Sequence, residues 1–175
     1  MARSTGNCIA DSLQLCLGYA ERLLKDIPAE SFGRFATVGG ETVNSNHPAF
    51  ILGHLSLYPI RVLTELGQDP ADAITPENYE SLFSDKVTCQ DDVDGTLYPP
   101  MEEIKEYFFK GYGAALEKLR AAEDEIFLQD NPAEGRLKEL FPTIGSMHAF
   151  YVGGHVMVHL GQLSAWRRMQ GMGPA

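Results

Sequence analysis

Two histidines near the C-terminus have the spacing of a metal-binding pair. His155 and His159 lie four residues apart in the segment GGHVMVHLGQLSAWRR. If this segment is helical, residues at that spacing share one face, with Cβ atoms about 5–6 Å apart. Two imidazoles so placed can bind one divalent ion, although two buried structural histidines would show the same pattern. The sequence therefore indicates part of a metal site.

A third histidine can supply the ligand that the pair lacks. His54 lies in FILGHLSLYP among apolar residues, so it is either a hydrogen-bonded core residue or an inward-facing ligand. Three neutral imidazoles hold a zinc-like ion and leave a position for water or substrate, and nickel, iron or cobalt suit the same donors. We therefore predict a site of His54, His155 and His159. A zinc-peptidase mechanism is disfavoured, because residues 156–158 lack the glutamate of an HExxH motif.

The same face of the C-terminal helix is predicted to carry His148, Gln162 and Trp166. His148 precedes His155 by two turns, about 10 Å along a helix axis, which is too far for the same coordination sphere. We expect His148 to line a pocket or to be structural, and Gln162 to line the site. His47 stands at a helix start and is expected to be a capping-region residue. No catalytic base is assigned.

The acidic loop and the cysteines are not predicted to be ligands. Asp91, Asp92 and Asp94 lack the glycine and glutamate spacing of a calcium loop, so we expect a solvated acidic loop. The three cysteines have no histidine or cysteine neighbour at ligand spacing. We expect them to be core or surface residues.

Long amphipathic helices must position the histidines. Apolar residues at three- and four-residue steps predict helices over residues 8–27, 46–67, 100–122 and 143–168, with a short extra helix at 76–84. Asn46 is the predicted N-cap of the second helix, and Pro59 should bend that helix just beyond His54. Residues 28–45 and 124–142 are expected to be connections, and no strand pattern competes. The sequence predicts an all-α four-helix bundle with long connections, as a single domain over residues 1–175.

Composition and charge exclude several classes of function. The chain has 175 residues and a formal net charge of −10. A net anion repels a polyanion, so we expect no direct nucleic-acid partner. The odd count of three cysteines favours reduced thiols and a cytoplasmic location. The N-terminal segment does not have the pattern of a signal peptide, and no apolar run approaches about 18 residues, so no membrane span is expected.

The histidine motifs and the predicted helices together resemble those of the DinB-like superfamily of damage-inducible, metal-binding four-helix proteins. The resemblance rests on HPAFILGHLSLYP, with its central Gly-His-Leu, and on GGHVMVHLGQLSAWRR, in which the histidine pair is followed by Gly-Gln-Leu. The order of the predicted helices resembles the family over nearly the whole chain, whereas the specific motifs cover only a small part of it. Family members often have an aromatic residue shortly before the first histidine, where this chain has Ile51-Leu52-Gly53. They also often have a polar or acidic residue between the second and third histidines, where this chain has Val156-Met157-Val158.

The resemblance implies a site and a class of activity. His54, His155 and His159 would be the ligands of one divalent transition metal, zinc or nickel, and Gln162 would line or orient the site. Characterised members include thiol-dependent S-transferases that use low-molecular-weight thiols and a thiol-dependent maleylpyruvate isomerase, and homodimers are frequent. We therefore expect a metal-dependent enzyme acting on a small molecule, an S-transferase first. A metal-dependent hydrolase and a non-catalytic metal-binding or interaction bundle remain open alternatives.

Overall fold

The computed structural model describes residues 3–175, and the fold is mostly helical. The α-helices are α1 (Thr5–Leu24), α2 (Pro48–Ser56), α3 (Pro59–Glu65), α4 (Asn78–Phe83), α5 (Met101–Ala121), α6 (Asp124–Phe127), α7 (Arg136–Leu140), α8 (Ile144–Ala149) and α9 (His155–Met169). A π-helical turn, η3 (Phe150–Gly154), joins α8 to α9, and η1 (Ala29–Ser31) and η2 (Ala71–Ala73) are 3₁₀ turns. The strands β1 (Ala36–Val38) and β2 (Glu41–Val43) form an antiparallel hairpin in which Thr37 is opposite Thr42.

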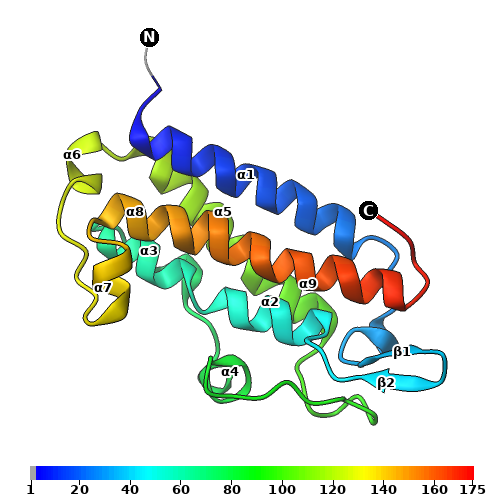
Figure 1. The fold of residues 1–175 in the computed structure, drawn as a ribbon. Helices are drawn as coiled ribbons and strands as arrows, with labels where there is room; N and C mark the ends of the chain where they lie inside the picture. Colours follow the sequence, from blue (N-terminus) through cyan, green and yellow to red (C-terminus); the bar gives the residue numbers. More distant parts are fainter. Residues whose placement is uncertain (1–2) are drawn as a thin grey trace.

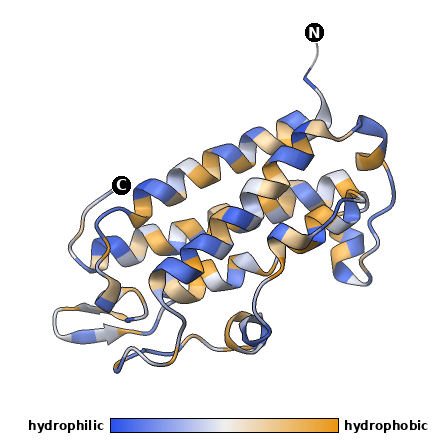
Figure 2. Cartoon of the chain, turned by 180° about the vertical axis from the view of Figure 1, so that it is seen from behind, coloured by the Kyte–Doolittle hydropathy of each residue, from blue (hydrophilic) through white to orange (hydrophobic). Residues whose placement is uncertain are grey.

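The long helices lie side by side around one apolar interior (Figure 1). α5 packs against α1, α2 and α3, and α9 packs against α1 and α2. Hydrophobic residues alternate with hydrophilic ones along these helices (Figure 2), as expected for helices that bury one face. Leu13, Leu52, Phe108 and Leu160 bring α1, α2, α5 and α9 together in the core, and each is fully buried. The prediction of a mostly helical chain is confirmed.

The first helix ends earlier than predicted. α1 stops at Leu24 rather than near residue 27, because Lys25 is extended and Asp26 has a left-handed φ of 61°. The buried Arg167 of α9 donates hydrogen bonds to the carbonyls of Leu23 and Lys25, at 2.7 and 2.6 Å. A cation at a helix C-terminus is favourable because it meets the negative end of the helix dipole. This contact ties α9 to the end of α1.

The second predicted helix is broken, not bent. α2 ends at Ser56 and α3 begins with Pro59 at its first position. Pro59 has no N–H to donate to the carbonyl of Leu55, and the chain responds with a tight turn in which Tyr58 donates to that carbonyl. The helix also starts one residue later than predicted: His47, not Asn46, is the N-cap, and its Nδ1 accepts from the backbone of Phe50 at 3.2 Å.

Two predicted connections contain regular structure that periodicity did not reveal. Residues 28–45 include the β1–β2 hairpin, which turns at Gly39 and Gly40; both have positive φ, as a two-residue hairpin turn requires. Residues 124–142 include the short helices α6 and α7. The predicted start of the last long segment is confirmed, since Thr143 forms a capping box with Ser146. No helix in residues 3–175 is long and apolar enough to cross a membrane.

Candidate metal centre

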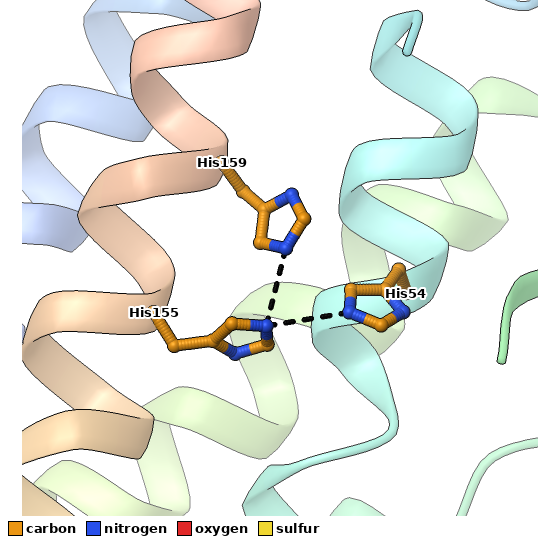
Figure 3. A group of neighbouring side chains, drawn as sticks. All are labelled: His54, His155 and His159. Atoms are coloured by element: carbon orange, nitrogen blue, oxygen red, sulfur yellow. Dashed lines mark hydrogen bonds between the residues drawn. The ribbon is translucent and has the colours of Figure 1, made fainter. Parts of the chain in front are cut away.

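Three histidines from two helices meet in the interior between α2 and α9. The Nε2 atom of His155 lies 3.3 Å from Nε2 of His54 and 3.1 Å from Nε2 of His159. Figure 3 shows the rings converging from α2 and α9. Each residue offers one ligand atom within 4.8 Å of the other two, so the group could hold a metal ion. The three residues that the sequence suggested as ligands are brought together.

His54 is held by a backbone carbonyl on its outer side. Its Nδ1 lies 2.7 Å from the carbonyl oxygen of Phe83, which can only accept, so Nδ1 carries the proton and Nε2 presents a lone pair to the centre. Gly53 makes this approach possible, because a Cβ at that position would lie 2.5 Å from the Phe83 ring. The glycine before His54 therefore lets α4 pack closely enough to orient the histidine.

His159 is oriented by a side-chain amide. Its Nδ1 lies 3.0 Å from Oε1 of Gln162, one helical turn later in α9. The same Oε1 accepts from Nδ2 of Asn46 at 3.2 Å, which fixes it as the oxygen of the amide. Nδ1 of His159 is thus the donor, and its Nε2 also presents a lone pair to the centre. Gln162 contacts the outer nitrogen of His159, one of the three converging imidazoles.

His155 completes a group that has more acceptors than donors. Its Nδ1 is buried and has no hydrogen-bond partner among the described residues. A neutral His155 has one N–H. If Nε2 carries the proton, it faces the lone pairs of both His54 and His159, and Nδ1 is left without a donor. If Nδ1 carries the proton, three lone pairs face one another. A cation at the centre would satisfy the converging nitrogens.

Burial keeps the two imidazoles on α9 neutral. Desolvation lowers the pKa of His155 to about 3, and the neighbouring His159 and His54 add to the shift. The pKa of His159 is lowered by desolvation and by His54, while its hydrogen bond to Gln162 opposes the shift. A histidine binds a metal through a neutral ring. Both residues on α9 are therefore held in the protonation state that a metal ligand needs.

The spacing of the nitrogens fits a small divalent ion. With zinc–nitrogen bonds of about 2.0–2.1 Å and tetrahedral angles, two ligand nitrogens should lie about 3.3 Å apart. The separations that involve His155, 3.1 and 3.3 Å, are close to that value. The donor set, its tautomers and its spacing all suit a metal ion with a free coordination position.

Two cavities reach the histidines from different sides. The larger, about 500 Å³, is lined by His155 together with Tyr58 and Arg61. The smaller, about 310 Å³, is lined by His54 and His159. Both are also lined by Ser84 and Asp85, the residues that follow α4. A ligand of the centre can therefore be approached from either cavity.

His148 does not join the centre. It is fully buried, and its Nε2 lies 2.8 Å from a carboxylate oxygen of Glu65 in α3. The prediction of one shared face assumed a continuous α-helix, but His155 donates its backbone N–H to Phe150, five residues back, in the π turn. This wider turn offsets the face of α8 from that of α9. Trp166 was predicted on the same face as the histidines, but its indole N–H donates to the carbonyl of Arg34.

The other residues considered as ligands have structural positions. His47 is a capping residue, as predicted, and its Nε2 lies 2.9 Å from the carbonyl of Gln90. The expectation of a fully solvated acidic loop is wrong. Asp92 is buried and accepts from three backbone N–H groups, those of residues 96–98, and Asp91 forms an ion pair with Arg34.

Sequence reasoning missed the residues that surround the open side of the centre. The hydroxyl of Tyr58 lies 3.4 Å from Nε2 of His54, and its ring packs edge-on against His155 with centroids 4.4 Å apart. Tyr58 and Arg61 follow His54 by four and seven residues, a helical spacing like that of His155 and His159. This spacing could have indicated that they lie near His54. Asp85 follows α4 and carried no comparable signal.

Comparison of the chain with protein-family models, with curated proteins and with solved structures finds no match.

Proposed function

We propose that the protein is a DinB-like four-helix-bundle protein that binds one divalent transition metal, zinc or nickel, through His54, His155 and His159 and uses it as an enzyme. The activity we propose is thiol-dependent S-transfer to a small molecule, in a homodimer. The two sequence motifs support the family, as does the packing of α1, α5, α2–α3 and α8–α9.

One observation carries the metal proposal. Two imidazoles, those of the buried His54 and the half-buried His159, are fixed by outer hydrogen bonds so that their lone pairs face the Nε2 of a third, His155. Such outer bonds orient the ligands in protein metal sites. Without an ion, Tyr58 can donate to Nε2 of His54 and His155 can donate to Nε2 of His159, but the buried Nδ1 of His155 is then left without a donor.

The chemistry follows from the donor set. A divalent ion on three neutral imidazoles keeps its double charge, leaves a coordination position and favours an anionic ligand there, such as a thiolate. Burial raises the pKa of Tyr58 to about 12, with Asp85 adding to the shift and Arg61 opposing it. The phenol therefore keeps its proton at neutral pH and can donate a hydrogen bond to a group bound beside His54.

The two buried thiols of the protein, Cys16 and Cys89, are poor nucleophiles. Cys89 lines the smaller cavity, but burial raises its pKa to about 11. Burial also raises the pKa of Cys16 to about 11. Both are protonated at neutral pH, and the thiol is a far weaker nucleophile than the thiolate. In the proposed transfer, the reacting thiol is that of a cosubstrate rather than either of these two buried cysteines.

A metal-dependent hydrolase is the second candidate, and Asp85 is the observation that favours it. This exposed carboxylate lines both cavities beside the histidines. A carboxylate in that position could accept the proton of an attacking water. The transferase has no need of such a base, because a metal-bound thiol is already deprotonated.

The test starts with metal content. Protein purified without added metal or a histidine tag should hold close to one transition-metal ion per chain, and His54→Ala should lose it. Cobalt-substituted protein is then titrated with 2-mercaptoethanol, and a thiolate-to-cobalt absorption band supports the transferase. Failure to bind zinc, nickel or cobalt contradicts the metal proposal; metal binding without a thiolate band favours the hydrolase.

A further inference from the structure

The larger cavity beside the histidines contains charges of both signs. Arg61 of α3 lines it, as do Glu80 of α4 and Asp85. Its volume of about 500 Å³ lies within the range of small-molecule sites. His155 forms part of the same wall, so a molecule in this cavity can reach the metal centre.

Arg61 is ordered but carries no neutralising carboxylate. Its guanidinium donates to the hydroxyl of Tyr151 and lies over that ring, 5.8 Å from the centroid. Among residues 3–175, no carboxylate forms an ion pair with it. Arg61 is exposed and lines the cavity without an acidic partner, so its guanidinium is available for an external anion. A guanidinium suits a carboxylate, which it can bind with two hydrogen bonds.

The acidic residues of this cavity are equally available. Neither Glu80 nor Asp85 forms an ion pair within the described part of the chain. Glu80, Asp85 and Arg61 line the same cavity as Tyr58, the residue whose hydroxyl lies 3.4 Å from Nε2 of His54. A singly charged ligand would meet one favourable and one unfavourable side of this cavity.

We propose that the cavity binds a small zwitterion of the amino-acid type, with its carboxylate on Arg61, its ammonium group on Glu80 and Asp85, and its reacting group toward the three histidines. The aromatic rings of Tyr58, Tyr151 and Phe150 form the rest of the wall around its body. This inference rests on the proposed metal centre, and it names the class of molecule that the centre acts on.

The test uses three thiols of one length on the zinc-loaded protein, with affinities from calorimetry. L-Cysteine carries both charges, cysteamine lacks the carboxylate, and 3-mercaptopropionate lacks the ammonium group. We expect L-cysteine to bind about tenfold more tightly than either analogue, since each charged contact contributes about one factor of ten. Metal content is measured before and after each titration, so that loss of zinc is distinguished from loss of the ligand site.

The variants separate the cavity from simple chelation. Arg61→Gln should abolish the preference for L-cysteine over cysteamine, and Glu80→Gln with Asp85→Asn should abolish the preference over 3-mercaptopropionate. Chelation of zinc by the amine and thiol is the same in the parent and in these variants. The matched control is Arg22→Gln, because Arg22 also lies over a tyrosine ring, that of Tyr19 at 5.5 Å, but outside this cavity.

The outcomes are distinguishable. A protein that takes up no zinc contradicts the metal centre itself. A zinc-loaded protein that does not bind L-cysteine, or whose preferences are the same in Arg61→Gln as in Arg22→Gln, overturns the zwitterion site and leaves the metal centre standing.

Discussion

Two histidines of one segment, α8 to α9, differ in what their Nε2 atoms contact: His148 is fully buried and His155 is half-buried. Nε2 of His148 has a carboxylate partner, Glu65, 2.8 Å away. Nε2 of His155 faces only other imidazoles, whereas Nδ1 is buried without a partner in both residues. The two histidines therefore differ at Nε2: the carboxylate of Glu65 pairs that atom in His148, and a cation would pair it in His155. The comparison shows that the partners of the ring nitrogens, more than burial, distinguish a metal ligand from a structural residue.

The largest effect is expected from removing the histidine at the middle of the centre. His155→Ala leaves two imidazoles on different helices, and the affinity for zinc should fall by more than a hundredfold, because losing even a supporting hydrogen bond at such a site costs about 10–100-fold. Metal content after gel filtration measures this. Full retention of zinc by the variant would contradict the three-histidine site.

His148→Ala should give the reverse pattern. The change leaves a cavity and removes the partner of Glu65, so the free energy of unfolding should fall by about 2–4 kcal/mol. Metal content should not change, because His148 does not contact the centre. Urea denaturation and metal analysis on the same preparation measure both effects. Loss of metal from a folded His148→Ala variant would mean that the two environments are not independent.

Two glycine substitutions, Gly53→Ala and Gly161→Ala, test whether close packing around His54 supports metal binding. Gly53→Ala would place a methyl group against the Phe83 ring, displacing the carbonyl that orients His54. We expect zinc affinity to fall by about 10–100-fold. Gly161→Ala is the control: this glycine lies in α9 between His159 and Gln162, and an added Cβ meets nothing within 4 Å. It should leave affinity unchanged and stabilise the helix by about 0.5–1 kcal/mol. Equal zinc affinities in the two variants would contradict the role of Phe83.

The smallest effect concerns pH. The pKa of His155 is about 3 in the fold, against 6.5 for an ordinary histidine. Between these values the unfolded chain binds the extra proton, so the stability of the metal-free protein should fall as pH is lowered from about 6.5 toward 3. Urea midpoints in the presence of a chelator, at pH 7.5, 6 and 5, measure this. His155→Ala should weaken the dependence, and an unchanged slope would contradict the assignment.

The sequence predicted the parts of the molecule that depend on local spacing. Helical periodicity located the long helices, and the four-residue step placed His155 and His159 on one face of α9. His54 was identified because a histidine among apolar residues needs a partner or an ion. These features depend on contacts within one helix, which the sequence displays directly.

The features that were missed depend on contacts between elements. Pro59 marked the position of a bend, but not that the helix would break there, and no residue pattern marked the π turn before His155. The carbonyl of Phe83 reaches His54, and Asp85 lines the two cavities beside the histidines, because α4 packs against α2. No periodic pattern in residues 68–98 marks that contact.

The π turn also constrains the length of the chain. A turn that bonds five residues back holds one residue more than an α-helical turn, as a single-residue insertion in a helix would. Without that extra residue, α8 and α9 would rotate by about 100° relative to each other, because an α-helix has 3.6 residues per turn. Only one of the two partnerships, His148 with Glu65 or His155 with His54, could then form. Substitutions within residues 150–154 can therefore be tolerated more readily than the deletion of a single residue there.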